Sequence, residues 1–130
     1  MATYFGSSIN ESPTIVLPAG EKLENARGIA LELKDGAAVK PAAGAHVIGL
    51  SLIETDETVE AGTDVDIQIK DIGKWVAGEE IAAGTELATD AEGKAVAAKA
   101  GDFIVGTALS NAAEAGTWVK IQIIKAGYKA

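Results

Sequence analysis

The sequence contains one structural unit twice, and this duplication restricts its fold more than any other feature. Residues 60–69 (EAGTDVDIQI) and 114–123 (EAGTWVKIQI) are identical at eight of ten positions, at an offset of 54. At an offset of 57, three glycines recur: Gly36 as Gly93, Gly44 as Gly101, and Gly49 as Gly106. We therefore divide the chain into an N-terminal arm, residues 1–14, and one domain, residues 15–130, made of two repeats at about 15–74 and 75–129. Two copies are too few for a solenoid, so we expect one body with pseudo-twofold symmetry.

The repeated segment reads as a strand with one buried face. Val65, Ile67 and Ile69 alternate with polar residues, and residues 119–123 repeat the alternation. Apolar segments at 46–53 and 103–109 each carry an internal glycine at the matching position, which predicts a bulge or bend in a strand. We expect one helical turn at residues 21–27. The predicted fold class is mainly β, a small barrel or sandwich built from two tandem similar β-units with an extended N-terminal arm.

The composition of the chain argues against several classes of function. The chain has 130 residues, a formal net charge of −8 and no cysteine. Its eleven basic residues form no run, which argues against a nucleic-acid groove, and the negative charge disfavours anionic membranes. The absence of cysteine excludes disulfides and thiolate catalysis. The first eight residues lack the features of a signal peptide, and the longest uncharged stretches, 41–53 and 103–113, are too short to span a bilayer. We expect a soluble protein made in the cytoplasm.

The search for catalytic, metal-binding and cofactor-binding residues selects none, and we predict that the protein is not an enzyme. The lone histidine, His46, corresponds to Phe103 in the second repeat, so we expect a semi-buried ring with a structural role. The acidic segment 54–60 matches no calcium loop and is expected to be solvated. Lys94 lies at a turn, as in biotin or lipoate carriers, but its counterpart is Ala37 and no methionine flanks it. A carboxylate pair among the nineteen acidic residues is not excluded, although nothing selects one.

Differences between the repeats point to a contact surface. Trp118 and Ile124 occupy outward strand positions where the first repeat has Asp64 and Lys70. Such side chains either meet a partner or are covered by a loop or arm of the same chain. The arm adds Tyr4, Phe5 and Ile9 in a segment where only Glu11 is charged, which suits ordering on a partner. We predict an interface formed by Tyr4, Phe5, Ile9, Trp118 and Ile124.

The second repeat resembles a known family. Residues 81–96 (IAAGTELATDAEGKAV), 104–109 (IVGTAL) and 116–121 (GTWVKI) are similar to the small decoration, or cement, proteins of tailed-bacteriophage capsids. The likeness covers about residues 75–129, the first half matches through the duplication, and the opening Met-Ala-Thr-Tyr also fits. The resemblance implies a β-rich structural protein, typically a homotrimer, on the outer surface of an assembled head. Its partner would be the major capsid protein, whose subunit junctions it stabilises, and its location the capsid surface of the virion.

Two other functions stay open. One is a virion-surface ligand-binding module or head-fibre base that contacts host glycans, with the acidic loop 54–60 or an exposed aromatic residue as platform. The other is a small enzyme with an unrecognised carboxylate pair, which the absence of a histidine or cysteine constellation disfavours.

Overall fold

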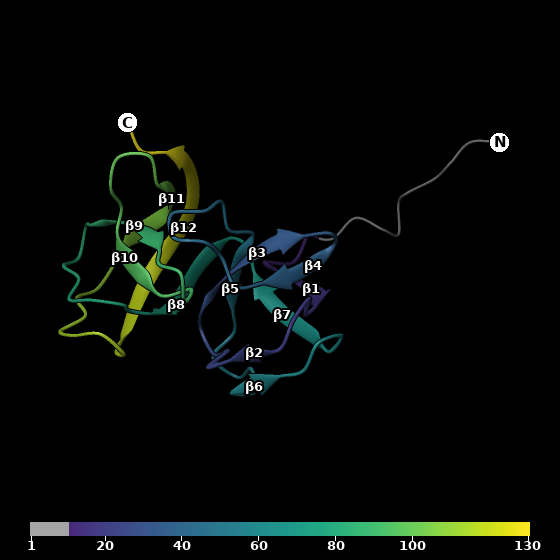
Figure 1. Ribbon diagram of the computed structural model, residues 1–130. Helices are drawn as coiled ribbons and strands as arrows, with labels where there is room; N and C mark the ends of the chain where they lie inside the picture. Colours follow the sequence, from purple (N-terminus) through teal and green to yellow (C-terminus); the bar gives the residue numbers. More distant parts are fainter. Residues whose placement is uncertain (1–10) are drawn as a thin grey trace.

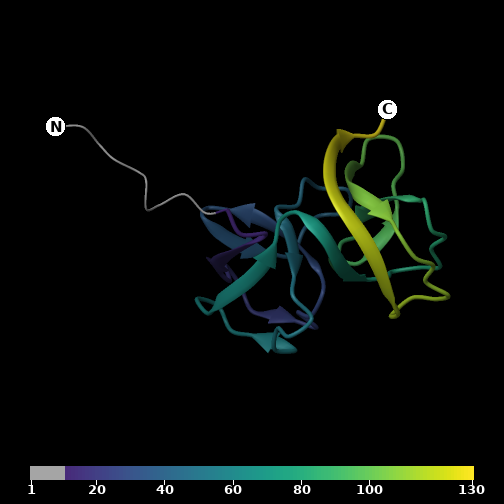
Figure 2. The same cartoon turned by 180° about the vertical axis from the view of Figure 1, so that it is seen from behind.

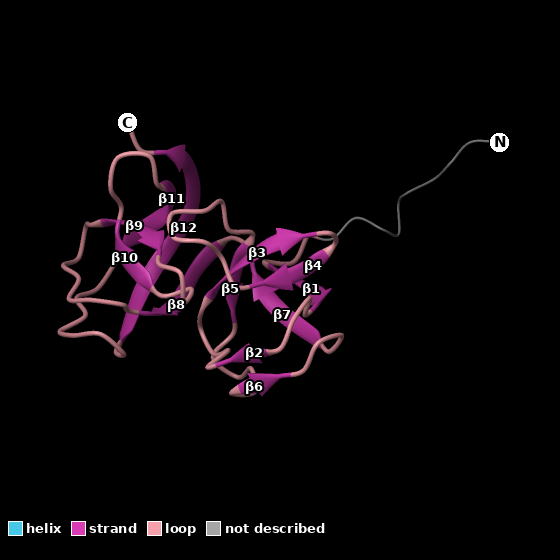
Figure 3. Ribbon diagram, viewed as in Figure 1, coloured by secondary structure: helices cyan, strands magenta, loops and turns pink. Residues whose placement is uncertain are grey.

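The part of the chain that the structure describes is built from strands alone. The computed structural model describes residues 11–130, which form twelve strands and no helix (Figure 3). The strands are β1 (Thr14–Pro18), β2 (Leu23–Glu24), β3 (Ala30–Lys34), β4 (Ala37–Val39), β5 (Gly49–Ser51), β6 (Thr58–Val59), β7 (Asp64–Gln68), β8 (Asp71–Val76), β9 (Glu86–Thr89), β10 (Ala95–Ala97), β11 (Phe103–Ala108) and β12 (Trp118–Tyr128). The predicted mainly β class is confirmed. The helical turn expected at 21–27 is wrong, because Leu23 is fully buried and pairs with Val59 in the β2–β6 ribbon.

Ten of the strands form two five-stranded sheets that lie side by side, and β2 and β6 form a third sheet of two strands (Figures 1 and 2). The first sheet has the order β1-β7-β5-β3-β4, and the second has the order β10-β9-β11-β12-β8. In each sheet the two outer strands are connected by one parallel bridge, Ala19 with Ala38 and Ala77 with Ala95. One bridge does not close a sheet into a barrel. Of the two architectures left open by the sequence, the sandwich-like one is therefore found.

The bridges explain why the sequence repeats Ala-Gly-Glu at residues 19–21 and 77–79. The alanines are buried, and the glycines and glutamates that follow them make equivalent hydrogen bonds. The Gly20 amide donates to the Ala38 carbonyl at 2.8 Å, and the Gly78 amide donates to the Ala95 carbonyl at 2.7 Å. The carboxylate of Glu21 accepts from the Lys40 amide at 3.0 Å, and that of Glu79 accepts from the Ala97 amide at 2.8 Å. A short buried side chain, a residue without a Cβ atom and a carboxylate acceptor are thus needed in this order in both sheets.

A buried tryptophan joins the two sheets. Trp75 on β8 is fully buried, and its indole N–H donates to the Gly93 carbonyl at 2.7 Å. The same carbonyl accepts from the Ala30 amide of β3 at 2.8 Å. Around it, Val47 and Leu50 of the first repeat share one hydrophobic core cluster with the residues of the second sheet. The repeats are therefore connected by packing and by backbone hydrogen bonds.

The glycines at equivalent strand positions, Gly49 and Gly106, are required because the backbone of a neighbouring strand lies close to each of them. A Cβ atom at Gly49 would overlap the Gln68 carbonyl oxygen, and one at Gly106 would overlap that of Gln122, which is the equivalent residue of the second repeat. The predicted irregularity is present in β11, where the pairing with β12 shifts register between Ile104 and Gly106. Each glycine lets two strands approach more closely than a side chain would permit.

We therefore expect Gly106→Ala to lower the free energy of unfolding by about 1–3 kcal/mol, because the added methyl group must displace the backbone of β12. Urea unfolding followed by circular dichroism measures the change. The neighbouring half-buried Thr107 on the same strand provides the control, since Thr107→Ala should change stability by only about 0.5 kcal/mol. An unfolding midpoint for Gly106→Ala equal to that of the parent would contradict the steric explanation.

Candidate interaction surface

β12 presents alternate side chains to solvent along its length. Val119, Ile121 and Ile123 are buried, whereas Trp118 is 43% exposed and Ile124 is 52% exposed. Trp118 and Ile124 thus lie on the outer face of the second sheet, where the period-2 pattern places them. Large apolar side chains on an otherwise polar face are typical of contact surfaces.

The neighbouring strand β8 extends this surface. Antiparallel pairing sets Val76 opposite Trp118, Lys74 opposite Lys120, and Ile72 opposite Gln122. Directly opposed residues point to the same side of a sheet. We call this surface the outer strip, and it consists of Ile72, Lys74, Val76, Trp118, Lys120, Gln122 and Ile124. It has apolar side chains towards both ends and two lysines in the middle.

The two lysines of the outer strip are not neutralised within the described chain. Lys74 and Lys120 are both exposed, and none of the ion pairs formed within residues 11–130 includes either of them. Like charges directly opposite each other on a sheet destabilise it. Desolvation by burial lowers the pKa of Lys125, next to Ile124. The strip therefore carries a local positive charge on a chain whose formal net charge is −8.

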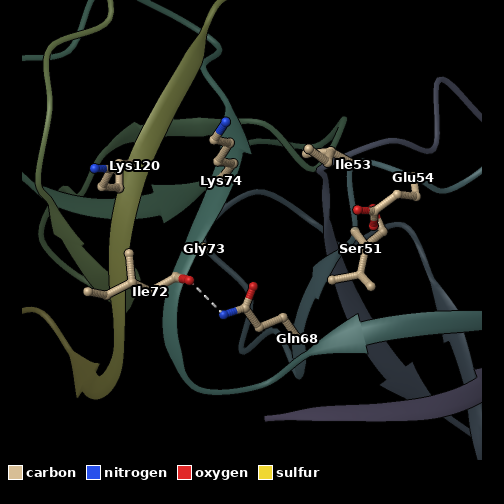
Figure 4. Close-up of a pocket in the computed structure, with 9 residues that line it drawn as sticks. Ser51, Ile53, Glu54, Gln68, Ile72, Gly73, Lys74 and Lys120 are labelled. Atoms are coloured by element: carbon tan, nitrogen blue, oxygen red, sulfur yellow. Dashed lines mark hydrogen bonds between the residues drawn. The ribbon is translucent and has the colours of Figure 1, made fainter.

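A hollow of about 280 Å³ lies between the outer strip and the first sheet (Figure 4). Lys74, Lys120 and Ile72 line one side of it, and Ile53 and Glu54 line the other. The connection between β7 and β8 is closed by Gln68, whose side-chain amide donates to the carbonyls of Lys70 and Ile72, both at 2.9 Å. Since Ile53 is 42% exposed and Ile72 is 58% exposed, the hollow offers a partner apolar surface beside the lysines.

Trp118 also contacts the first repeat. Its indole lies against Gly28, where φ is +60° and where a Cβ atom would overlap the ring. The Gly28 carbonyl accepts from the Val76 amide at 2.9 Å, which holds this loop against β8. A second hollow, of about 270 Å³, is lined here by Arg27 and Lys94 among others. The two alternatives for Trp118 therefore both apply in part: a loop of the same chain covers one side of the ring, and the rest is exposed.

Acidic side chains gather around a third hollow, of about 330 Å³, beside the first sheet. Its lining includes the exposed carboxylates of Glu54, Asp56, Glu60, Asp64 and Asp66. In residues 11–130, no three acidic or histidine side chains are arranged to hold a metal ion. We call this region the acidic hollow.

The other residues singled out from the sequence do not belong to the outer strip. Tyr4, Phe5 and Ile9 lie outside the described residues. The expected semi-burial of His46 is wrong: its ring is exposed and stacks on buried Phe103 with centroids 4.3 Å apart. The two equivalent positions meet between the repeats, so one ring covers the other. The interface predicted from the sequence did not include Ile72 or Lys74. Their alternation with the buried residues Gly73 and Trp75 is nevertheless the period-2 pattern of a strand.

The similarity of this chain to known proteins is found at the level of structure. Neither a protein-family model nor a curated protein matches this sequence. Among solved structures, the head fibre gp8.5 N base of bacteriophage phi29 is similar, with a TM-score of 0.65 and 20% sequence identity. The two chains share a fold. The similarity covers 90% of this chain and 98% of the phage protein's chain. Residues 11–130 contain no helix long and apolar enough to cross a membrane.

The contact between Trp118 and Gly28 gives a stability prediction. Trp118→Ala should lower the free energy of unfolding by about 1–2 kcal/mol, because part of the ring is buried against the first repeat. Ile124→Ala provides the comparison on the same strand, with an expected change of about 0.5 kcal/mol for a more exposed side chain. Chemical unfolding of both variants measures the difference. Equal losses would show that the Gly28 contact does not stabilise the fold.

Proposed function

We propose that this chain is a structural protein of the head surface of a tailed bacteriophage, and that it acts as the base of a head fibre. The observation that carries the proposal is the shared fold, which extends over nearly the whole of both chains. The phi29 protein is described as the N base of a head fibre. The sequence resemblance to capsid decoration proteins supports the same location, since both groups belong to phage heads.

The outer strip supports a binding role. Trp118 and Ile124 are large apolar side chains exposed on β12, and the pairing of Trp118 with Val76 of β8 fixes the position of the tryptophan. Rigid apolar side chains lose little conformational freedom on binding and are enriched among the residues that dominate protein interfaces. In this proposal the partner is the major capsid protein, and the chain acts on the capsid surface of the virion as a homotrimer without catalytic activity.

A second candidate is the decoration, or cement, function itself. The sequence pattern of residues 81–96, 104–109 and 116–121, which resembles that of decoration proteins, favours this function. Such a protein stabilises junctions between capsid subunits, and many modest contacts on one shell together raise the barrier to its opening. The two functions share attachment to the head and differ in what the attached protein does there.

Cryo-electron microscopy of heads from a phage that encodes this chain tests the proposal, with a gene deletion as the matched control. We expect density for the fold on the outer surface of the parent heads and its loss in the deletion. Loss of projecting fibres together with that density supports the base function, whereas heads that lose the density and open at lower temperature support the cement function. Unaltered head surfaces in the deletion would contradict both. A glycan array with the purified protein tests the contact with host glycans.

Binding to the phage head should depend on the N-terminal arm, residues 1–14. We expect deletion of residues 2–12 to abolish binding to isolated heads, because the arm carries Tyr4, Phe5 and Ile9 and almost no charge. Co-sedimentation with heads measures binding, and an unchanged unfolding midpoint establishes that the truncated chain still folds. Undiminished binding would show that the arm has no part in attachment.

A further inference from the structure

The repeated strand carries opposite charges in its two copies. On β7 the outward residues are Asp64 and Asp66, and the equivalent outward residues of β12 are Trp118 and Lys120. All four side chains are exposed. One surface of the fold is therefore acidic in the first repeat and basic and apolar in the second.

Within residues 11–130, neither charged region takes part in an ion pair. The ion pairs found in residues 11–130 join Lys22 with Glu24, Lys40 with Glu92, and Lys129 with Glu86. The acidic hollow and the two lysines of the outer strip contribute no member to them. Each region therefore contains like charges close together, and a surface of opposite charge would relieve the repulsion in both.

The two regions are adjacent and yet do not pair with each other. The hollow beside Lys74 and Lys120 shares Leu52 and Glu54 with the acidic hollow, so the regions meet at the same loop. In Figure 4 the lysines extend from β8 and β12, while Glu54 lies across the hollow near Ile53. A second molecule that approaches here meets a basic surface, exposed isoleucines and an acidic surface in succession.

We infer that this chain binds a second copy of itself, with Lys74 and Lys120 of one copy against the acidic hollow of the next. The exposed side chains of Ile53 and Ile72 lie beside the lysines and supply the apolar part of the contact. Each copy offers one basic and one acidic surface, so every copy both donates and receives the contact, and such a head-to-tail contact forms a ring where the rotation between copies closes. The inference specifies the self-association that forms part of the proposed function.

Charge reversal tests this contact in the full chain. One variant carries Lys74→Glu with Lys120→Glu, a second carries Asp64→Lys with Asp66→Lys, and a third combines all four changes. The third keeps the formal net charge of −8, because two lysines and two aspartates are exchanged in sign. Lys22→Glu with Lys34→Glu is the control: both residues are exposed, and neither lines a hollow described above. Light scattering over a concentration series measures the mass of each variant, and circular dichroism checks folding.

We expect the parent and the control to associate. Each two-residue reversal should weaken association by about 100-fold or more, and the combined variant should restore it. Restoration in the combined variant excludes misfolding as the cause, and the control, which has the same net charge as the Lys74→Glu, Lys120→Glu variant, excludes an effect of net charge. A monomeric parent, reversals that associate like the parent, or a combined variant that remains dissociated would each overturn the inference.

The results separate this inference from the proposed function. A monomeric parent that binds heads only with Lys74 and Lys120 intact would assign the outer strip to the head surface; it would overturn self-association, including the homotrimer, and leave the function at the head surface in place. Association that follows the charges, together with heads that lack the protein, would sustain the self-contact and contradict the function at the head surface.

Discussion

A single backbone carbonyl organises the junction on which the rest of the structure depends. Gly93 O accepts both the indole N–H of Trp75 and the amide of Ala30, and thereby connects β8 of the second sheet to β3 of the first. The turn that offers it has no space for a side chain, because a Cβ atom at Gly93 would lie 2.8 Å from the Ala30 carbonyl oxygen. A buried indole N–H without a partner is costly, so the position of this turn is tightly specified.

The placement of β8 follows from that junction, and the surface features follow from β8. Trp75 faces inward, which turns its neighbours Lys74 and Val76 outward beside β12. The hollow between the sheets and the pairing of Lys74 with Lys120 both depend on this orientation. Because the unit is duplicated, β7 and β12 present equivalent outward surfaces. Their exposed residues differ in charge and polarity, whereas the buried face of each strand keeps the same pattern.

The features that could be predicted from the sequence are those set by local pattern. The alternation along β12 identified its buried face and the outward positions of Trp118 and Ile124, because a strand with one face in the core has period 2. Trp75 corresponds to Leu17 of the first repeat at an offset of 58, and this correspondence predicts its position in the core. The opposition of Lys74 and Lys120 depends on the register between two strands far apart in the sequence, and the packing of Trp118 on Gly28 depends on how the repeats meet. His46 was misplaced for the same reason, since its partner Phe103 comes from the other repeat.

The pairing of β12 also determines how the fold bears load. β12 runs from Trp118 to Tyr128 and pairs with β11 on one side and β8 on the other, as its continuous ribbon in Figure 2 shows. Hydrogen bonds between antiparallel strands are perpendicular to the strands, so a pull along β12 from its C-terminal end loads two ladders in shear at the same time. β10, with three paired residues on β9, would instead peel away from its sheet one bond after another. A pull along β12 is thus resisted by sheared ladders, whereas a pull on β10 is resisted by one bond at a time.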